Sequence, residues 1–203
     1  MLEYLLTHKL ELAATVTGLI CVWLNARESV WGWVWGLVSV GMYAWIFWEA
    51  RLYADAGLQL VFAASSVYGI WLWSRGGTAR EQHPVSYGSV QEWLVLGLLT
   101  AGFSAALGWL LSTQTPDPRP WLDAALTAAS LAAQYQLARK RIENWLVWIA
   151  VDAVYVFLYL DQALYWTTFL YAAYLGIAAW GYWGWKSAFT SATAGTRSST
   201  GTS

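Results

Sequence analysis

The sequence predicts an all-α integral membrane protein with seven transmembrane helices, and three observations support this fold class. Of the 203 residues, 58% are hydrophobic and only 11% are charged, whereas about a quarter of the residues of an ordinary soluble domain are charged. Seven apolar stretches approach the length of about 20 residues that a helix needs to cross the hydrocarbon core. The segments between them are short and carry most of the charged and turn-forming residues, which leaves no space for a soluble domain.

Each apolar stretch is predicted to be a helix because lipid cannot satisfy unpaired backbone N–H and C=O groups. In chain order the predicted spans are residues 10–24, 30–48, 58–73, 93–111, 121–137, 145–160 and 165–185. Residues 1–186 form one predicted transporter domain. Beyond it, residues 187–203 are rich in Ser, Thr, Ala and Gly, so they cannot bury enough apolar surface to fold alone and are predicted to be a disordered tail.

The distribution of basic residues predicts the orientation in the membrane. Only Lys9, Arg51 and Arg119 lie on the side of the N-terminus. Since basic loops tend to remain cytoplasmic, the N-terminus is expected outside and the C-terminus in the cytoplasm. The residues of the basic side are Arg27, Arg75, Arg80, Arg139, Lys140, Arg141, Lys186 and Arg197.

An internal repeat relates the two halves of the chain. A shift of 112 residues carries Leu52-Tyr53 onto Leu164-Tyr165 and Gly69 onto Gly181, and it also matches Leu58, Trp71 and Trp73 with Leu170, Trp183 and Trp185. An offset larger by one residue brings Trp31 opposite Asn144 and Trp35 opposite Trp148. We therefore expect repeat one at about 10–74, a connector helix at about 91–112 and repeat two at about 121–186. An odd connector makes the repeats parallel, with a site between them near the midplane.

The sixth span carries the most informative residues. Asn144, Trp148, Asp152, Tyr155 and Tyr159 follow a spacing that places them on one helix face. An ionised carboxylate near mid-membrane costs several kcal/mol unless it faces water, a cation or hydrogen-bond donors, so Asp152 indicates a functional site. The alternatives are a neutral Asp152 hydrogen-bonded across a helix pair, and an aromatic stripe that only packs.

Further candidates come from the first half of the chain. Trp31 and Trp35 share a face of the second span with Ser39, although Trp31 alone would suit an interfacial anchor. Gln59 opens the third span and could equally join two helices by a hydrogen bond. Together these residues suit an aromatic ring bearing hydroxyl groups, and indole faces would attract a cationic ring.

The sequence lacks the residues that several other functions require. Cys21 is the only cysteine, so neither a disulfide nor a metal cluster is expected, and no cofactor is implied. The net charge of -1, with scattered basic residues, does not support nucleic-acid binding. No Walker motif, HExxH motif or mid-membrane lysine occurs. No second acid is expected within the membrane, so passive or trapping-coupled uptake is favoured over pumping.

The chain resembles the PnuC family of bacterial nicotinamide riboside transporters. The resemblance rests on Trp31-x-x-x-Trp35, on residues 43–47 and 50–55 with Leu58-Gln59, and on Asn144-x-x-x-Trp148 with Asp152, Leu170-Tyr171 and Gly181. It implies a three-plus-one-plus-three arrangement similar to SWEET sugar transporters in a bacterial inner membrane. It also implies facilitated diffusion of nicotinamide riboside, trapped by a cytoplasmic riboside kinase.

Under this resemblance each candidate residue has an expected role. Trp35 and Trp148 are expected to contact or gate the nicotinamide ring, together with Trp31. Asn144, Asp152 and Gln59 are expected to bind ribose hydroxyls or the carboxamide. Tyr155, Tyr171 and Trp183 are expected to line the site.

Three alternatives stay open. Related families carry thiamine or riboflavin on the same fold, and fold does not determine substrate. A membrane scaffold or receptor could use the polar face to bind a partner helix. A membrane enzyme could use Asp152 as a general base. A homo-oligomer is compatible with each of these.

Overall fold

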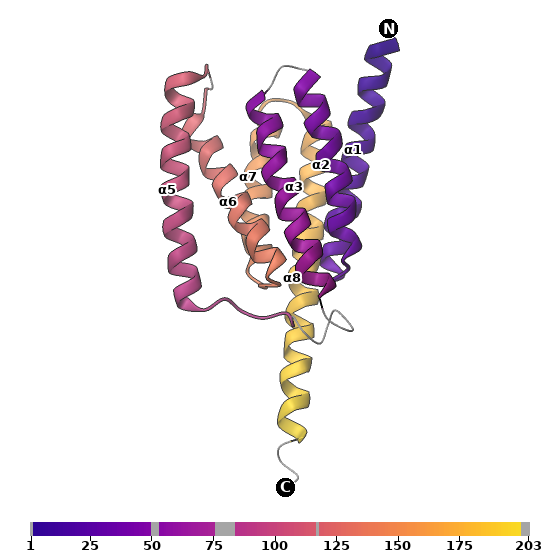
Figure 1. Ribbon diagram of the computed structural model, residues 1–203, viewed down its shortest axis with the longest axis vertical. Coiled ribbons are helices and arrows are strands. Elements are labelled where there is room, and N and C mark those ends of the chain that lie inside the picture. The colour runs from indigo at the N-terminus through magenta and orange to yellow at the C-terminus, as the bar shows by residue number, and fades with distance from the viewer. Residues whose placement is uncertain (1, 50–52, 76–83, 117, 200–203) are drawn as a thin grey trace. The chain divides into compact units, whose positions relative to one another are not determined.

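The computed structural model describes residues 2–49, 53–75, 84–116 and 118–199. These ranges contain seven α-helices and no strand (Figure 1), in agreement with the predicted fold class. The helices are α1 (Leu2–Ala26), α2 (Trp31–Glu49), α3 (Tyr53–Ser74), α5 (Val90–Gln114), α6 (Pro120–Ala138), α7 (Asn144–Asp161) and α8 (Tyr165–Ser199).

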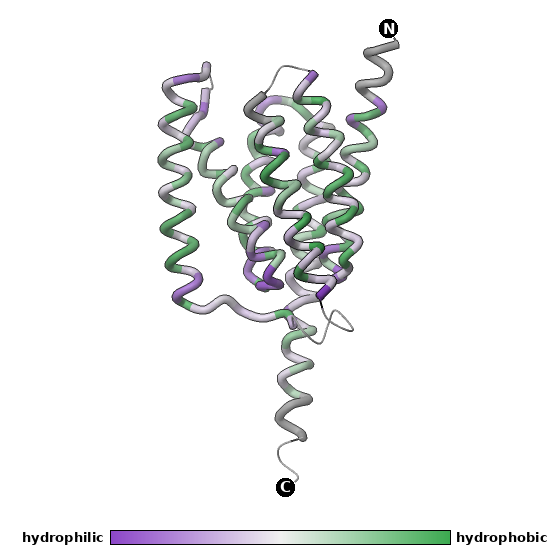
Figure 2. Tube along the Cα trace, in the orientation of Figure 1, coloured by the Kyte–Doolittle hydropathy of each residue, from purple (hydrophilic) through white to green (hydrophobic). Residues whose placement is uncertain are grey.

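Every described helix is long enough to cross a membrane, but the helices differ in apolarity. The mean hydropathy of α1, α3, α5 and α7 marks them as spans by composition. Figure 2 shows apolar residues along α5, with hydrophilic residues at its ends. The helices α2 and α6 have 19 residues each, and tryptophan and tyrosine lower the hydropathy of α2. These rings favour membrane interfaces, so its lower hydropathy does not argue against a span.

The chain forms two compact units that meet between Pro84 and Val85, where the sequence predicted one domain. In the first unit, α2 packs against both α1 and α3. In the second unit, α5 packs on α6, α6 on α7, and α7 on α8. The first unit therefore contains predicted repeat one, and the second contains the predicted connector helix α5 with repeat two.

Equivalent turns close α1 and α6. Glu28 and Lys140, which are 112 residues apart, both have a positive φ, of 58° and 52°. The N–H of Glu28 donates to Asn25 O and that of Ser29 to Leu24 O, each at 3.0 Å. In the second unit, the N–H groups of Lys140 and Arg141 make the two equivalent hydrogen bonds. This pattern is the Schellman motif, which satisfies the last carbonyls of a helix.

A pair of tryptophans and a glycine packs in the same way in both repeats. In the first unit the Trp33 ring lies against Gly69, and the Trp73 ring meets it edge-on at 5.5 Å and 88°. In the second unit Trp145 lies against Gly181, and Trp185 meets it at 5.3 Å and 87°. Both helix pairs thus approach closely at a residue without a side chain.

These contacts extend the offset of 112 residues to α2 and α7. Trp33 is the equivalent of Trp145, so Gly32 corresponds to Asn144 and Gly36 to Trp148. The expected change of offset, which paired Trp31 with Asn144 and Trp35 with Trp148, is not present.

The helix α8 continues to Ser199, which differs from the disordered tail predicted from residue 187. Hydroxyl groups within this extension bond back to the preceding turn: Thr190 Oγ1 donates to Lys186 O at 3.0 Å, and Ser191 Oγ donates to Ser187 O at 3.0 Å. Side chains that satisfy backbone carbonyls in this way are compatible with a polar helix.

The positive φ of Glu28 gives a first test of the repeated turn. A β-branched residue is disfavoured in the left-handed region by about 1–2 kcal/mol, whereas Asn tolerates it. We expect Glu28→Val to lower the Tm by roughly 3–6 °C relative to Glu28→Asn. Both variants remove the carboxylate, so thermal unfolding in detergent isolates the backbone effect. Equal Tm values would contradict the left-handed conformation.

Candidate functional site

Four tyrosines form a contiguous ring cluster beside Asp152 in the second unit. Tyr155 and Tyr159 on α7 are stacked at 5.8 Å. Tyr171 on α8 lies 4.7 Å from Tyr155 and 5.2 Å from Tyr159, and Tyr174 contacts Tyr171 edge-on at 5.9 Å. We call Tyr155, Tyr159, Tyr171 and Tyr174 the tyrosine cluster.

The acidic group of this site is Asp152, which is only 6% exposed on α7. Asp152 lies close enough to Tyr155 and Tyr171 for electrostatic interaction. A second carboxylate, Asp123 in the first turn of α6, is in electrostatic range of Tyr155 and Tyr159. Two acids are therefore within electrostatic range of the cluster, an arrangement that favours a positively charged group.

Asn144 begins α7 and is fully buried. Its Nδ2 donates to Arg141 O at 2.5 Å, which ties the side chain to the preceding turn. Its Oδ1 has no hydrogen-bond partner among the described residues. A buried acceptor without a partner costs about 1–3 kcal/mol, so Oδ1 is suited to accept a hydrogen bond from a ligand.

Trp148 lies one turn after Asn144 and one turn before Asp152, and its side chain is half-buried. The spacing places its indole on the same face of α7 as both residues. The structure thus keeps Asn144, Trp148, Asp152 and Tyr155 on the helix face that the sequence predicted, and it brings Tyr171 to them from α8.

Three of the predicted site residues lie in the first unit. Trp31 and Trp35 on α2 are 62% and 38% exposed, and Gln59 on α3 is half-buried. By the offset of 112 residues, Gln59 is the equivalent of Tyr171, and Tyr43 is the equivalent of Tyr155. The stacked pair Tyr43 and Phe47, at 5.9 Å, repeats the stacking in the tyrosine cluster.

Trp183 does not join the tyrosine cluster. It is 65% exposed near the end of the predicted span, and Lys186 Nζ lies 5.5 Å from its ring centroid. Its equivalent, Trp71, carries Arg75 over its ring at 4.1 Å. A cation over an exposed indole in both repeats is typical of a membrane-interface anchor.

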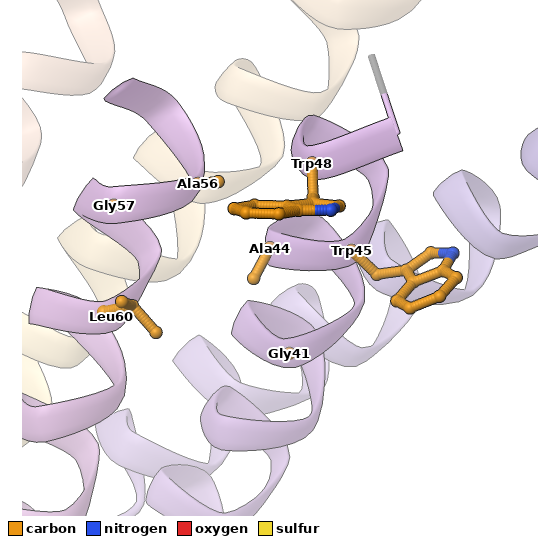
Figure 3. A pocket seen from close by; sticks show the side chains of 7 residues that line it. All are labelled: Gly41, Ala44, Trp45, Trp48, Ala56, Gly57 and Leu60. Atoms are coloured by element: carbon orange, nitrogen blue, oxygen red, sulfur yellow. The ribbon is translucent and has the colours of Figure 1, made fainter. Parts of the chain in front are cut away.

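A groove of about 500 Å³ lies between α2 and α3 in the first unit (Figure 3). Its wall is apolar, and none of the predicted site residues lines it. The groove is open where Gly57 has no side chain; the equivalent residue of repeat two is Phe169. Its lining residues are Gly41, Ala44, Trp45, Trp48, Ala56, Gly57 and Leu60.

Residues 8–187 match the family described as nicotinamide mononucleotide transporter. The chain belongs to this family. The family is one of membrane transporters, and its match covers α2 to α7 completely, with most of α1 and α8. The resemblance to PnuC proteins inferred from the motifs is confirmed.

Relatives of this chain are named for different substrates. The nicotinamide riboside transporter PnuC of Escherichia coli K12 is 27% identical, over 77% of this chain and 76% of that protein. The riboflavin/roseoflavin transporter RibM of Streptomyces davaonensis is 30% identical, over 86% and 83%. The crystal structure of the vitamin B3 transporter PnuC matches with a TM-score of 0.69 and 25% identity, covering 88% of this chain and 80% of that one.

Sequence reasoning missed three members of the site. Tyr159 was placed on the stripe but not among the binding residues, and Tyr174 was not considered. The position of Tyr174 three residues after Tyr171 could have shown that both share a helix face. Asp123, which the sequence did not single out, lies in the first turn of α6 and within electrostatic range of Tyr155.

Proposed function

We propose that this protein carries nicotinamide riboside across the membrane by facilitated diffusion, with net uptake driven by phosphorylation of the substrate inside the cell. The observation that carries the proposal is the buried Asp152 within electrostatic range of Tyr155 and Tyr171 of the tyrosine cluster. Nicotinamide riboside combines a cationic aromatic ring, a carboxamide and a hydroxylated ribose, and each part has a matching group on α7 or α8.

The cationic ring is matched by the aromatic faces and the carboxylate. A desolvated cation over a tyrosine or tryptophan ring gains about 2 kcal/mol, so the tyrosine cluster and Trp148 are proposed as its wall. Asp152 offsets the positive charge where the local dielectric constant is low. Asp123 adds a second negative charge within electrostatic range of Tyr155.

The polar parts of the substrate are matched by acceptors and hydroxyls. Asn144 Oδ1 is buried without a partner and would accept from the carboxamide or a ribose hydroxyl. The tyrosine hydroxyls can both donate and accept. From the first unit we propose Gln59, Trp35 and Trp31 as further contacts. Trp183 stays a predicted lining residue, although Lys186 already lies over its ring.

The charge of the site favours the riboside over the mononucleotide that gives the family its description. A phosphate adds up to two negative charges, which Asp152 and Asp123 would repel. The same repulsion supports trapping: a kinase that phosphorylates the riboside turns it into a product that the acidic site rejects.

Riboflavin is a second candidate, because the riboflavin/roseoflavin transporter RibM is 30% identical over 83% of its length. Its ring system is flat and bears a hydroxylated chain, which suits tyrosine faces. That ring system is neutral, however, and does not need a buried carboxylate. The carboxylate of Asp152 therefore favours the cationic substrate.

We further propose a bacterial cell membrane as the location, with the N-terminus outside and the C-terminus in the cytoplasm. The support is the excess of basic residues in the loops on one side. Labelling of single cysteines placed in the loop after α1 and in the loop after α7 would test this orientation.

Substrate identity is tested by competition in proteoliposomes of the purified protein. Saturable entry of labelled nicotinamide riboside is expected, with inhibition by the unlabelled riboside. Much weaker inhibition is expected from nicotinamide mononucleotide, thiamine and riboflavin. Entry of riboflavin but not of the riboside would overturn the substrate and support the second candidate, while no entry of any vitamin would support the scaffold or receptor.

A further inference from the structure

A dense polar network binds the turn between α6 and α7 to the segment that leads into α5. Ser86 N–H donates to Lys140 O at 3.1 Å, and Ile142 N–H donates to Ser86 O at 3.0 Å, so Ser86 and Arg141 form a parallel bridge. The Arg141 side chain continues the contact: its Nη1 donates to Ser86 Oγ at 2.6 Å and to Tyr87 O at 3.2 Å.

Two carboxylates complete this network. Glu92, in the first turn of α5, accepts from Arg141 Nη2 at 2.7 Å and from Arg141 Nε at 3.2 Å. Such a two-point Arg–carboxylate pair fixes geometry as well as adding energy. Glu143 Oε1 accepts from Gly88 N–H at 2.9 Å and from Trp93 Nε1 at 3.3 Å. We call Ser86, Glu92, Arg141 and Glu143 the connector clasp.

The clasp is not needed to form the turn itself. The equivalent turn of the first repeat has the same Schellman hydrogen bonds and the same positive φ. There the residues equivalent to Arg141 and Glu143 are Ser29 and Trp31, which have neither a guanidinium nor a carboxylate group. The clasp thus adds a property to repeat two that the turn alone does not require.

The position of Asn144 indicates what that property is. Arg141 O accepts from both Asn144 Nδ2, at 2.5 Å, and Asn144 N, at 3.2 Å. The residue whose side chain closes the clasp therefore also holds the amide that begins α7. Four polar contacts hold the Arg141 side chain to the connector segment, and holding Arg141 in turn fixes the Asn144 side chain and its buried Oδ1.

We propose that Arg141 and Glu92 are positioning residues for substrate binding, and that the connector clasp stays closed throughout the transport cycle. The clasp orients Asn144 and the start of α7 without touching the substrate. It makes α5 and repeat two a single rigid part of the transporter, so conformational change occurs elsewhere. The proposal rests on the proposed function only for Asn144 as a substrate contact.

A reversible covalent clasp tests this proposal. Directly bridged residues lie about 5 Å apart, within the range of Cα separations that a disulfide spans. Ser86→Cys with Arg141→Cys in a Cys21→Ala background therefore removes the side-chain contacts of Arg141 when reduced and replaces them by a covalent bond when oxidised. The readout is the KM and Vmax for labelled nicotinamide riboside in proteoliposomes, with free thiols quantified by maleimide labelling.

We expect the reduced protein to show a KM raised about tenfold with little change in Vmax, since indirect positioning typically changes affinity by a few-fold to tens of fold. Oxidation is expected to return the KM towards that of the background protein. An unchanged KM in the reduced protein would contradict the positioning role. A block of transport on oxidation would contradict the permanently closed clasp, and failure of the disulfide to form would contradict the bridge.

Two comparisons between variants separate positioning from folding, and the background protein separates it from the choice of substrate. The exchange Glu92→Arg with Arg141→Glu should recover part of the affinity lost in Arg141→Glu alone. Arg139→Ala is the matched control, because Arg139 is not one of the clasp residues and its exposed guanidinium lies over the Tyr135 ring at 5.9 Å. If the background protein does not transport the riboside, the proposed substrate fails, and the clasp is then measured with the vitamin that it does carry.

Discussion

Asp152→Asn is expected to lower the rate of nicotinamide riboside uptake at low substrate concentration about 100-fold. Asp152 is the buried carboxylate beside the tyrosine cluster, and the amide keeps its shape while removing its charge. Loss of one partner of a buried charge pair costs about 2–5 kcal/mol, and each 1.4 kcal/mol is tenfold. Initial rates in proteoliposomes, normalised to protein content, measure the effect.

Asp161→Asn is the matched control on the same helix. Asp161 is the last residue of α7, its side chain is 63% exposed, and it faces Arg119 at 3.6 Å. An exposed pair of this kind contributes about 0–1 kcal/mol, so uptake should change less than about fivefold. Equal losses in both variants, or full uptake by Asp152→Asn, would show that the buried charge does not recognise the substrate.

Gly69→Ala is expected to lower the Tm by about 5–10 °C, because the new methyl group would overlap the Trp33 ring. That ring is fully buried and is held edge-on by Trp73, so it has little freedom to move. Overpacking a tight contact costs about 1–3 kcal/mol or more, and a chain of this size loses about 2–4 °C per kcal/mol. Gly181→Ala, at 2.8 Å from Trp145, should behave in the same way.

Two glycines on the same helices provide the controls for this second prediction. A side chain at Gly57 on α3 or Gly176 on α8 would meet nothing within 4 Å. Since Ala favours a helix over Gly by about 1 kcal/mol, Gly57→Ala and Gly176→Ala should leave the Tm unchanged or raise it. If all four variants have the same Tm, the close packing of the indole on the glycine is not what holds each repeat together.

The internal repeat could be predicted in part from the sequence. Matching residues in α3 and α8 reveal the offset of 112, because glycine and tryptophan recur there at identical spacing. The start of α2 has tryptophans at 31, 33 and 35, so identity alone does not select one of them. The packing against Gly69 shows that Trp33 is the equivalent of Trp145. Such a contact between helices is not visible in the pattern of one helix.

The candidate site was similarly predictable only along single helices. The period of α7 places Asn144, Trp148 and Asp152 on one face. The contact of Tyr171 with Tyr155 and the proximity of Asp123 depend on how α6, α7 and α8 pack. The role of the Arg141 carbonyl in holding Asn144 depends on the turn, which hydrophobic periodicity does not describe.

The extent of α8 differed from prediction for a local reason. Low apolarity after Lys186 indicated that these residues could not form a core, which remains compatible with an exposed helix. It did not exclude a helical backbone, because Ala favours helices.

The central claim is facilitated diffusion with trapping, and the measurement that tests it most directly is the internal level of labelled nicotinamide riboside in proteoliposomes at long times. Without ATP or an ion gradient, the internal riboside should reach the external concentration and stop there, chemically unaltered. With a riboside kinase and ATP enclosed, label should accumulate above that level as the phosphorylated product. Accumulation of unaltered riboside without the kinase, or no entry at all, would contradict the account.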